Sequence, residues 1–273
     1  MSILQSATDP ALLAAMDASS AEEMACLARS VSGAEIHEDA EMQWFFMGPK
    51  RFNGVLRFSL ASEDASYVEA RIAQVLDYFR ARGVGIGWPV GPATRPAILP
   101  TYLEAHGFVR ESDHIGMVAD LFTLNEDQPP VAGLAIKEVL DQETLQVWRP
   151  VTMRGFESSD EHVQMYYEGY RNLGFGGELP WHHYLGYLDG APVASGSLLL
   201  HAGVAGIYGI TTVPEARRRG IGTAITLHAL REARALGYRV GILFPSDMGL
   251  NVYQRIGFQE CCRIPFYTRS SGH

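Results

Sequence analysis

The sequence predicts an α/β protein made of two domains. The chain has 273 residues, which exceeds the roughly 100 to 200 residues of an ordinary domain. Residues 123–133 gather proline, glycine and acidic side chains and lose apolar periodicity, as linkers do. Helical and strand-like patterns alternate on both sides of this segment, which indicates α/β layering in each part. We therefore expect one domain at 1–125 and another at 134–273.

Ten elements are expected in the second domain, in the order β, α, α, β, β, β, α, β, α, β. They occupy residues 134–139, 141–148, 161–170, 181–188, 192–200, 204–213, 222–236, 239–244, 248–256 and 264–268. The second and third strands form a hairpin, because Asp189-Gly190 between them supplies the positive φ values of a tight turn. Residues 201–203 make another turn before the fourth strand.

The helix at 222–236 has clear signals at both ends. Pro214 ends the preceding strand, because proline has no N–H for a sheet ladder. Ile225 and Ala229 repeat at helical spacing on its apolar side, and Gly237 follows as a C-terminal stop. A strand and a second, shorter helix then follow in the expected α/β order.

The two halves of the chain share an approximate repeat. A helical run leads into Gly85-Ile86-x-x-Pro89 in the first half and into Gly241-Ile242-x-x-Pro245 in the second. Each copy is followed by a helix that ends in Gly-Phe, at 107–108 and at 257–258. The repeat indicates two related domains.

Residues 217–222 read Arg-Arg-Arg-Gly-Ile-Gly and lie where a strand gives way to a helix. A helix N-terminus has unpaired N–H groups and a partial positive charge, so it favours phosphate. Gly220 and Gly222 let a ligand approach the backbone, and the arginines add charge-assisted hydrogen bonds. A P-loop would need a lysine, and a dinucleotide fold would need G-x-G-x-x-G; both are missing here. The pattern predicts a site for another diphosphate.

Two motifs in this order resemble those of the GNAT superfamily of N-acetyltransferases. Residues 213–224 resemble its acetyl-CoA signature R-x-x-G-x-G/A, and residues 246–258 resemble its segment N-x-x-A-x-x-L-Y-x-x-x-G-F. Ser246 stands where the family often has Asn, and Gly249 where it often has Ala. Together with the repeat, the resemblance implies two GNAT-like domains, each a mixed, mostly antiparallel sheet flanked by helices, with acetyl-CoA as acyl donor.

The resemblance also implies which residues meet acetyl-CoA. The strand before the loop would splay from its neighbour and pair its free backbone groups with the pantetheine arm, while the loop would hold the diphosphate. The residues implied are Ile210, Thr211, Thr212, Val213, Arg218, Arg219, Gly220, Ile221, Gly222, Thr223, Ala224, Ser246 and Tyr253. Tyr253 would also be the general acid that protonates the leaving thiolate.

Acyl transfer further needs a neutral amine and a stabilised oxyanion. An alkyl amine with a pKa near 10.4 is protonated at pH 7, a deficit of about 4 to 5 kcal/mol, so a base or a water relay is expected. A backbone N–H among residues 210–212 is expected to bind the oxyanion. Five side chains are candidates for the base, and the sequence does not choose among them: His182, His183, Glu178, Tyr208 and His201. The two adjacent histidines alternate on a strand, so one of them faces the buried side of the sheet.

The first domain is expected to keep the scaffold and to lack the cofactor site. Alignment through the two G-I-x-x-P segments places Glu63 and Asp64 opposite Arg219 and Gly220. Two carboxylates at this turn would repel a diphosphate. Leu103 takes the place of the catalytic tyrosine, so no hydroxyl is left for the leaving sulfur. This half is therefore predicted to be a degenerate GNAT-like domain.

Composition and charge limit the partners. The net charge is -9, and residues 1–133 hold nine basic and eighteen acidic side chains, so no nucleic-acid partner is expected. No apolar run reaches about 18 residues and no secretion signal begins the chain, which predicts a cytoplasmic protein without a membrane partner. The three cysteines have no C-x-x-C or Cys/His spacing, so no metal site is expected. A homodimer is compatible with the sequence.

The sequence thus predicts an acyl-CoA-dependent N-acetyltransferase. Its second domain would transfer the acetyl group of acetyl-CoA to a primary amine, on a small molecule. Two alternatives stay open: a non-catalytic acyl-CoA sensor or regulatory module, and an acetyltransferase for a protein N-terminus or lysine. The second alternative would need an open peptide groove.

Overall fold

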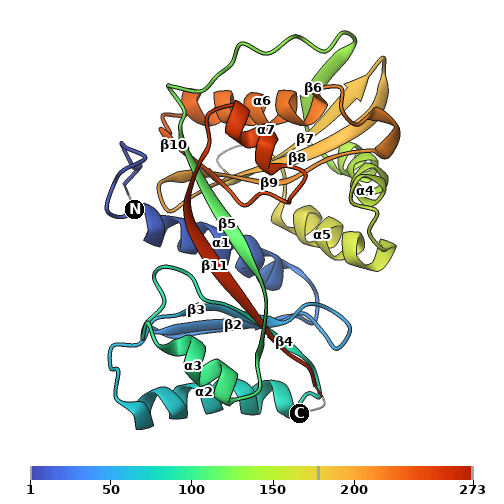
Figure 1. Cartoon of the computed structure of the whole chain (residues 1–273). Coiled ribbons are helices and arrows are strands. Elements are labelled where there is room, and N and C mark those ends of the chain that lie inside the picture. The colour runs from blue at the N-terminus through green and yellow to red at the C-terminus, as the bar shows by residue number, and fades with distance from the viewer. Residues whose placement is uncertain (1, 177–178, 272–273) are drawn as a thin grey trace. The chain divides into compact units, whose positions relative to one another are not determined.

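The computed structural model describes residues 2–176 and 179–271 (Figure 1). They form the expected mixed α/β fold, with mostly antiparallel strands flanked by helices. The chain divides into two compact units. The large unit contains Met1–Ser19 and Gly116–Cys261, and the small unit contains Ser20–Ile115 and Cys262–His273.

Three elements run from one unit into the other, namely α1 (Leu12–Ser30), β5 (Val109–Asp120) and β11 (Gln259–Arg269). The end of β5 pairs with β10 (Val240–Leu243) of the large unit, and the end of β11 pairs with β4 (Ile86–Pro89) of the small unit. The units therefore differ in composition from the consecutive segments 1–125 and 134–273. Pairing between strands that are distant in sequence leaves no local signal, which is why a linker search does not reveal it.

The large unit holds a sheet with the order β5-β10-β9-β8-β7-β6. The pair β9–β10 is parallel, and the other described pairs are antiparallel. Its remaining elements are β6 (Leu134–Glu138), α4 (Gln142–Phe156), α5 (Asp160–Leu173), β7 (Trp181–Leu188), β8 (Ala191–His201), β9 (Val204–Thr212), the 3-10 helix η1 (Pro214–Ala216), α6 (Ile221–Ala235) and α7 (Leu250–Arg255). The ten elements expected in the second half are all present in the expected order, the last of them as part of β11.

Helix α4 is longer than predicted. The predicted helix stops at Trp148, whereas α4 continues through Pro150. Asp141 caps its start by accepting a hydrogen bond from the N–H of Thr144, and Glu157 ends it with a φ of 53°. Packing against β8 and β9 compensates for the backbone hydrogen bond that the internal proline removes.

Helices cover both faces of the sheet in the large unit. On one face, Ile225 of α6 lies against Gly186 of β7 and Gly196 of β8. On the other face, Thr152 of α4 shares a hydrogen bond with Ser195 of β8 (2.9 Å). Side chains alternate along a strand, so neighbouring residues of β8 serve different faces.

The segment predicted as a linker is tied to α6. Residues 121–133 contain neither helix nor strand, and Figure 1 shows their trace passing over α6 (green, at the top). Glu126 forms ion pairs with Arg231 and Arg234, each at 2.6 Å. The segment is thus held to the helix by charge, although it lacks regular structure.

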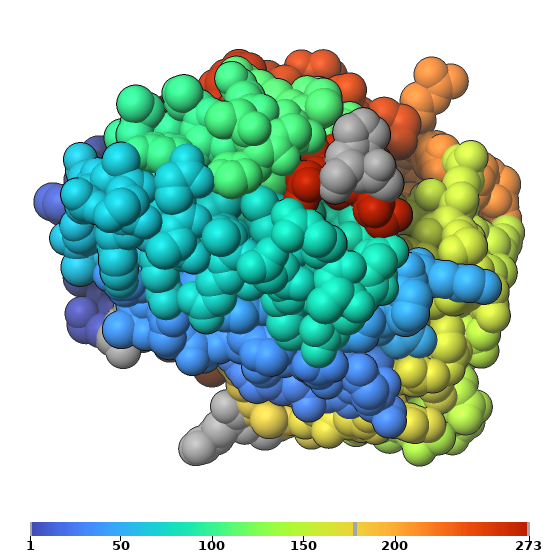
Figure 2. Space-filling model, turned by 90° about the horizontal axis from the view of Figure 1, so that it is seen from below, coloured from blue at the N-terminus to red at the C-terminus, as the bar shows by residue number. Residues whose placement is uncertain are grey.

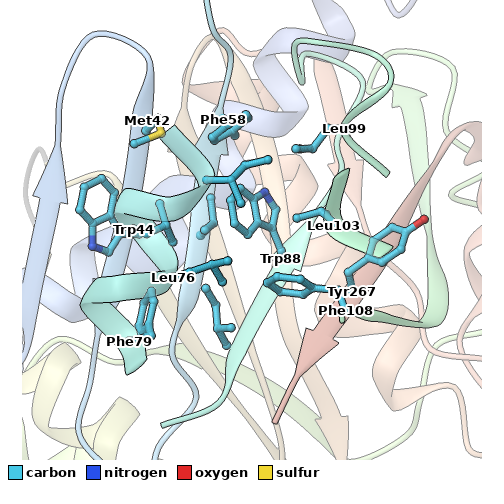
Figure 3. Packing of buried hydrophobic residues seen from close by; sticks show 14 of the residues in the cluster. Met42, Trp44, Phe58, Leu76, Phe79, Trp88, Leu99, Leu103, Phe108 and Tyr267 are labelled. Atoms are coloured by element: carbon cyan, nitrogen blue, oxygen red, sulfur yellow. The ribbon is translucent and has the colours of Figure 1, made fainter. Parts of the chain in front are cut away.

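The small unit has the strand order β1-β2-β3-β4-β11, and β3–β4 is its parallel pair. Its elements are β1 (Glu35–Glu38), β2 (Met42–Phe46), β3 (Gly54–Phe58), α2 (Ala65–Arg80), β4 and α3 (Leu99–Ala105), with the adjoining parts of the shared elements. Trp88 is at the centre of its core, with Phe58 at 5.2 Å and Phe108 at 5.7 Å between ring centroids (Figure 3). The outward side of α2 belongs to the face turned to the viewer in Figure 2 (cyan).

Helix α1 begins in the large unit. The hydroxyl of Ser19 lies 3.0 Å from that of Tyr208 on β9, and both residues are buried. One turn further along the helix, burial raises the pKa of Glu23 to about 7. Neither α1 nor any other helix of the described chain combines the length and the apolar character needed to cross a membrane.

Candidate functional site

Strand β9 carries a bulge. Thr211 pairs with Ser195 of β8, and Tyr208 pairs with Ser197, so two residues of β9 stand opposite Gly196 alone. One of these two is Gly209, whose φ of 59° requires the left-handed region that glycine tolerates. The extra residue frees backbone groups from the ladder and turns them away from β8.

The same strand separates from its other neighbour just before the bulge. The parallel pairing of β9 and β10 covers Ala205, Gly206 and Ile207, and β10 ends there at Leu243. β9 nevertheless continues to Thr212. Its last residues, which are those predicted to meet pantetheine, therefore present one backbone edge that β10 does not cover.

Helix α6 starts beside this edge. Gly220 is its N-cap, with a φ of 81° and no side-chain cap hydrogen bond. A Cβ on Gly222, in the first turn, would lie 3.7 Å from Ile210 and 3.9 Å from the hydroxyl of Thr212. The structure thus brings the predicted strand residues and the predicted helix start together.

The three arginines before α6 have different roles. Arg217 is bound on the protein itself: it donates to the carbonyls of Thr212 (3.1 Å) and Gly155 (2.9 Å) and pairs with Glu157 (2.9 Å). Arg218 and Arg219 are exposed, and within residues 2–176 and 179–271 neither forms an ion pair. The second and third arginines, which were the predicted ligands, therefore keep their charge available, while the first fixes the loop to the end of α4.

The uncapped start of α6 contrasts with the other long helices that carry a described cap. Asp64 caps α2, Asp141 caps α4, and Ser159 caps α5, each by accepting a backbone N–H. The N–H groups in the first turn of α6 have no such acceptor. They are the groups that an anion would satisfy.

Tyr253 lies on α7 and reaches toward α6. Its ring packs against Gly249, and its hydroxyl forms a hydrogen bond with Thr226. Burial raises the pKa of the phenol to about 12, so the phenol is protonated at neutral pH. Thr226 in turn donates to the carbonyl of Gly222 (2.9 Å), one turn after the start of α6. Ser246 is exposed, and its carbonyl accepts the first hydrogen bonds of the α7 turn.

The candidates for the base occupy different environments. His183 is buried and lies 2.8 Å from the hydroxyl of Ser197, whereas His182 lies 2.7 Å from Glu138. Tyr208 is buried beside α1, and His201 is partly buried at the end of β8. Glu178, the fifth candidate, lies outside the described residues. Among the described residues, no three His, Cys, Asp or Glu side chains are placed to hold a metal ion.

A family model matches most of the C-terminal part of the large unit. Residues 145–258, which contain the bulge, the α6 start and Tyr253, match the acetyltransferase (GNAT) family. These residues form a GNAT acetyltransferase domain. Within the GNAT domain, Thr226 was not assigned from the sequence, and Arg217, which was grouped with the arginines expected to bind phosphate, is bound to the protein itself. The i to i+4 spacing from Gly222 could have indicated Thr226, because residues four apart share one face of a helix.

Solved structures share the fold over almost the whole chain. A GCN5-related N-acetyltransferase from Kribbella flavida is 18% identical with a TM-score of 0.69, covering 93% of this chain and 96% of that one. A tandem GNAT protein from the clavulanic acid biosynthesis pathway is 17% identical with a TM-score of 0.65, covering 92% and 88%. A GCN5-related N-acetyltransferase from Sphaerobacter thermophilus is 14% identical with a TM-score of 0.63, covering 96% and 92%. No curated protein matches the chain.

The small unit differs from the GNAT domain at the start of its long helix and at the edge of its parallel strand. Asp64 is the N-cap of α2, as Gly220 is of α6, which agrees with the alignment through the G-I-x-x-P segments. Arg95 pairs by its backbone with the end of β3, donating to the carbonyl of Phe58 and accepting from the N–H of Leu60. The chain itself thus covers the strand edge that stays open on β9 in the GNAT domain.

Proposed function

We propose that this protein transfers the acetyl group of acetyl-CoA to a primary amine of a small molecule. The start of α6 carries the proposal: a helix N-terminus without a cap, two exposed arginines and an open strand edge lie side by side. The diphosphate of acetyl-CoA would bind the N–H groups of residues 220–224 and the side chains of Arg218 and Arg219. The pantetheine arm would pair with the backbone of residues 210–213.

The proposed reaction assigns one role to the backbone of residues 210–212 and another to Tyr253. The thioester carbonyl would lie where a backbone N–H of residues 210–212 can donate to its oxygen as negative charge develops. Tyr253 would then protonate the sulfur as the C–S bond breaks. A free thiol has a pKa of about 8.5, so complete transfer from a phenol of pKa about 12 is uphill by roughly 5 kcal/mol. Burial of the sulfur raises the pKa of its thiol and narrows this gap.

Binding can be tested by placing a carboxylate at the start of α6. Gly220→Asp puts a negative charge among the N–H groups that the diphosphate needs, so calorimetric affinity for acetyl-CoA should fall at least tenfold. Gly237→Asp is the matched control: it lies at the other end of α6, also has a positive φ (90°), and its Cβ would meet no atom within 4 Å. Equal affinity in the two variants, or no binding by the unaltered protein below millimolar concentration, contradicts the proposal.

A non-catalytic acyl-CoA sensor is the second candidate, and one observation favours it. At the position that corresponds to Tyr253 in the sequence repeat, the small unit has Leu103, which is fully buried and has no hydroxyl that could act as an acid. The two functions differ in turnover. Thiol release from acetyl-CoA with any member of an amine panel supports the enzyme, whereas tight binding without release from any amine supports the sensor.

A further inference from the structure

Two buried serines flank the bulge of β9 from the neighbouring strand. Ser195 and Ser197 point to the same face of β8, on either side of Gly196. Ser195 shares a hydrogen bond with the hydroxyl of Thr152 (2.9 Å), and Ser197 with a ring nitrogen, Nδ1 of His183 (2.8 Å). The two serines are thus equivalent in burial and in strand, and they differ in the chemistry of their partners.

The bulge is open to solvent next to Ser197. Gly209 is exposed, although the residues before it, from Gly203 to Tyr208, are buried. A Cβ on Gly209 would have one non-adjacent heavy atom within 4 Å, the hydroxyl oxygen of Ser197 at 3.9 Å. Ser197 itself is 2% exposed, and its hydroxyl is the side-chain group that lies nearest to the open side of Gly209.

The partner of Ser197 is a neutral imidazole. His183 is 3% exposed and lies between aromatic rings, with Tyr170 of α5 at 3.8 Å and Trp181 at 5.6 Å. Burial, with a smaller effect of the neighbouring His182, lowers the pKa of His183 to about 3, so His183 is neutral at rest and can hold a proton only transiently. Its unprotonated nitrogen can accept a hydrogen bond from Ser197 in one of its two tautomers.

We propose that Ser197 is a catalytic residue that takes a proton from the acceptor nitrogen at the bulge and passes its own hydroxyl proton to His183. His183 is a positioning residue, because it acts through Ser197 and does not touch the acceptor. The inference rests on the proposed function and assigns the group that removes a proton from the acceptor nitrogen after it has attacked the thioester. It also implies that the amine enters from the face of the sheet covered by α4 and α5.

The proton balance of this step closes. The neutral amine attacks the thioester carbon, and its nitrogen becomes positively charged in the tetrahedral intermediate. An N–H bond then breaks as Ser197 Oγ gains the proton, and the Ser197 O–H bond breaks as His183 Nδ1 gains the other. The C–S bond breaks while Tyr253 gives its proton to sulfur. The imidazolium returns its proton through Ser197 to water, and the Tyr253 phenolate takes one from water, so amide and free thiol are the net products.

The test compares the two serines in the full chain. Thiol release from acetyl-CoA is measured with a panel of primary alkyl and aryl amines for the unaltered protein, Ser197→Ala and Ser195→Ala. Each alanine leaves one buried polar partner without its hydrogen bond, so a purely structural role predicts similar losses. The proposed relay, in which a proton passes from the acceptor through Ser197 to His183, predicts that kcat falls about 100-fold in Ser197→Ala relative to Ser195→Ala. The calorimetric affinity for acetyl-CoA should not change.

Two further variants separate proton transfer from packing. Ser197→Thr keeps the hydroxyl and should retain activity within about tenfold of the unaltered protein. His183→Gln keeps a hydrogen-bonding group but accepts no proton, so kcat should fall while KM for acetyl-CoA stays the same. Equal kcat in Ser197→Ala and Ser195→Ala, with turnover by the unaltered protein, overturns the relay alone. No thiol release by the unaltered protein with any amine overturns the proposed enzyme, and the relay with it.

Discussion

The ring of Tyr253 packs so closely on Gly249 that a Cβ added there would come within 2.8 Å of the ring. This contact limits where the ring of Tyr253 can lie beside Gly249. The family often has alanine at this position, so the GNAT domain of this chain holds its tyrosine in a place that an alanine would not permit without movement of the ring.

Gly249→Ala should therefore displace Tyr253. Because the ring must shift by several tenths of an ångström, we expect kcat to fall about tenfold through poorer alignment with the sulfur, while acetyl-CoA affinity changes little. Steady-state kinetics and calorimetry measure the two effects. Unchanged kcat would mean that the position of the Tyr253 ring does not limit the reaction.

Tyr253→Phe should remove the acid and leave the packing. The ring remains against Gly249 and Phe258, so the thermal midpoint should change little, but kcat should fall about 100-fold. Since burial raises the phenol's pKa to about 12, Tyr253 stays protonated across pH 6–9 and should cause no loss of rate there. A tyrosine-dependent decline of kcat within that range would contradict this environment.

Much of the GNAT domain could be predicted because its signals are local. Asp189-Gly190 marks a hairpin, Pro214 ends a strand, and Gly237 follows the last turn of α6; each choice depends on the φ or the N–H of one residue. The contrast between Asp64 and Gly220 was also predictable, since a cap is a property of the residue at the helix start.

The rest depends on contacts between distant residues. Nothing near Gly209 in the sequence shows that it stands in a bulge, because the bulge is defined by the pairing of β9 with β8. The pairing of Ser197 with His183 requires the register of two strands, which the alternation of side chains alone does not provide. The exchange of β5 and β11 between the units has the same origin.

Gly155→Ala tests how closely α4 approaches β9. A Cβ at this position would lie 2.5 Å from the hydroxyl oxygen and 2.6 Å from the methyl carbon of Thr211, so the strand or the helix must move. We expect a loss of about 1 to 3 kcal/mol in the free energy of unfolding, measured by urea titration. The double variant Gly155→Ala/Thr211→Ala should recover more than half of this loss, and full additivity of the two single effects would contradict the contact.

Glu23→Gln tests the effect of a buried carboxyl group on stability. Burial raises the pKa of Glu23 from 4.5 to about 7, so the folded state binds its proton more tightly than the unfolded state does. The stability that this tighter proton binding supplies is fully present below about pH 4.5 and is lost as the pH rises through 7. Gln cannot ionise, so at pH 8 the free energy of unfolding of Glu23→Gln should exceed that of the unaltered chain by about 2 to 3 kcal/mol. At pH 4 this difference should be absent. Urea titration followed by tryptophan fluorescence measures the difference.

Asp39→Asn should show the opposite dependence in the same unit. Burial opposes ionisation of Asp39, but hydrogen bonds from Arg71 and from the N–H groups of Glu41 and Met42 outweigh it and lower the pKa to about 2. The stability that these bonds supply is present above the ordinary pKa of about 3.8 and is lost as the pH falls toward 2. Asp39→Asn should therefore cost more at pH 8 than at pH 3, whereas Glu23→Gln gains with rising pH. If the stability changes of the two variants varied with pH in the same direction, overall charge, and not these two environments, would govern the pH dependence.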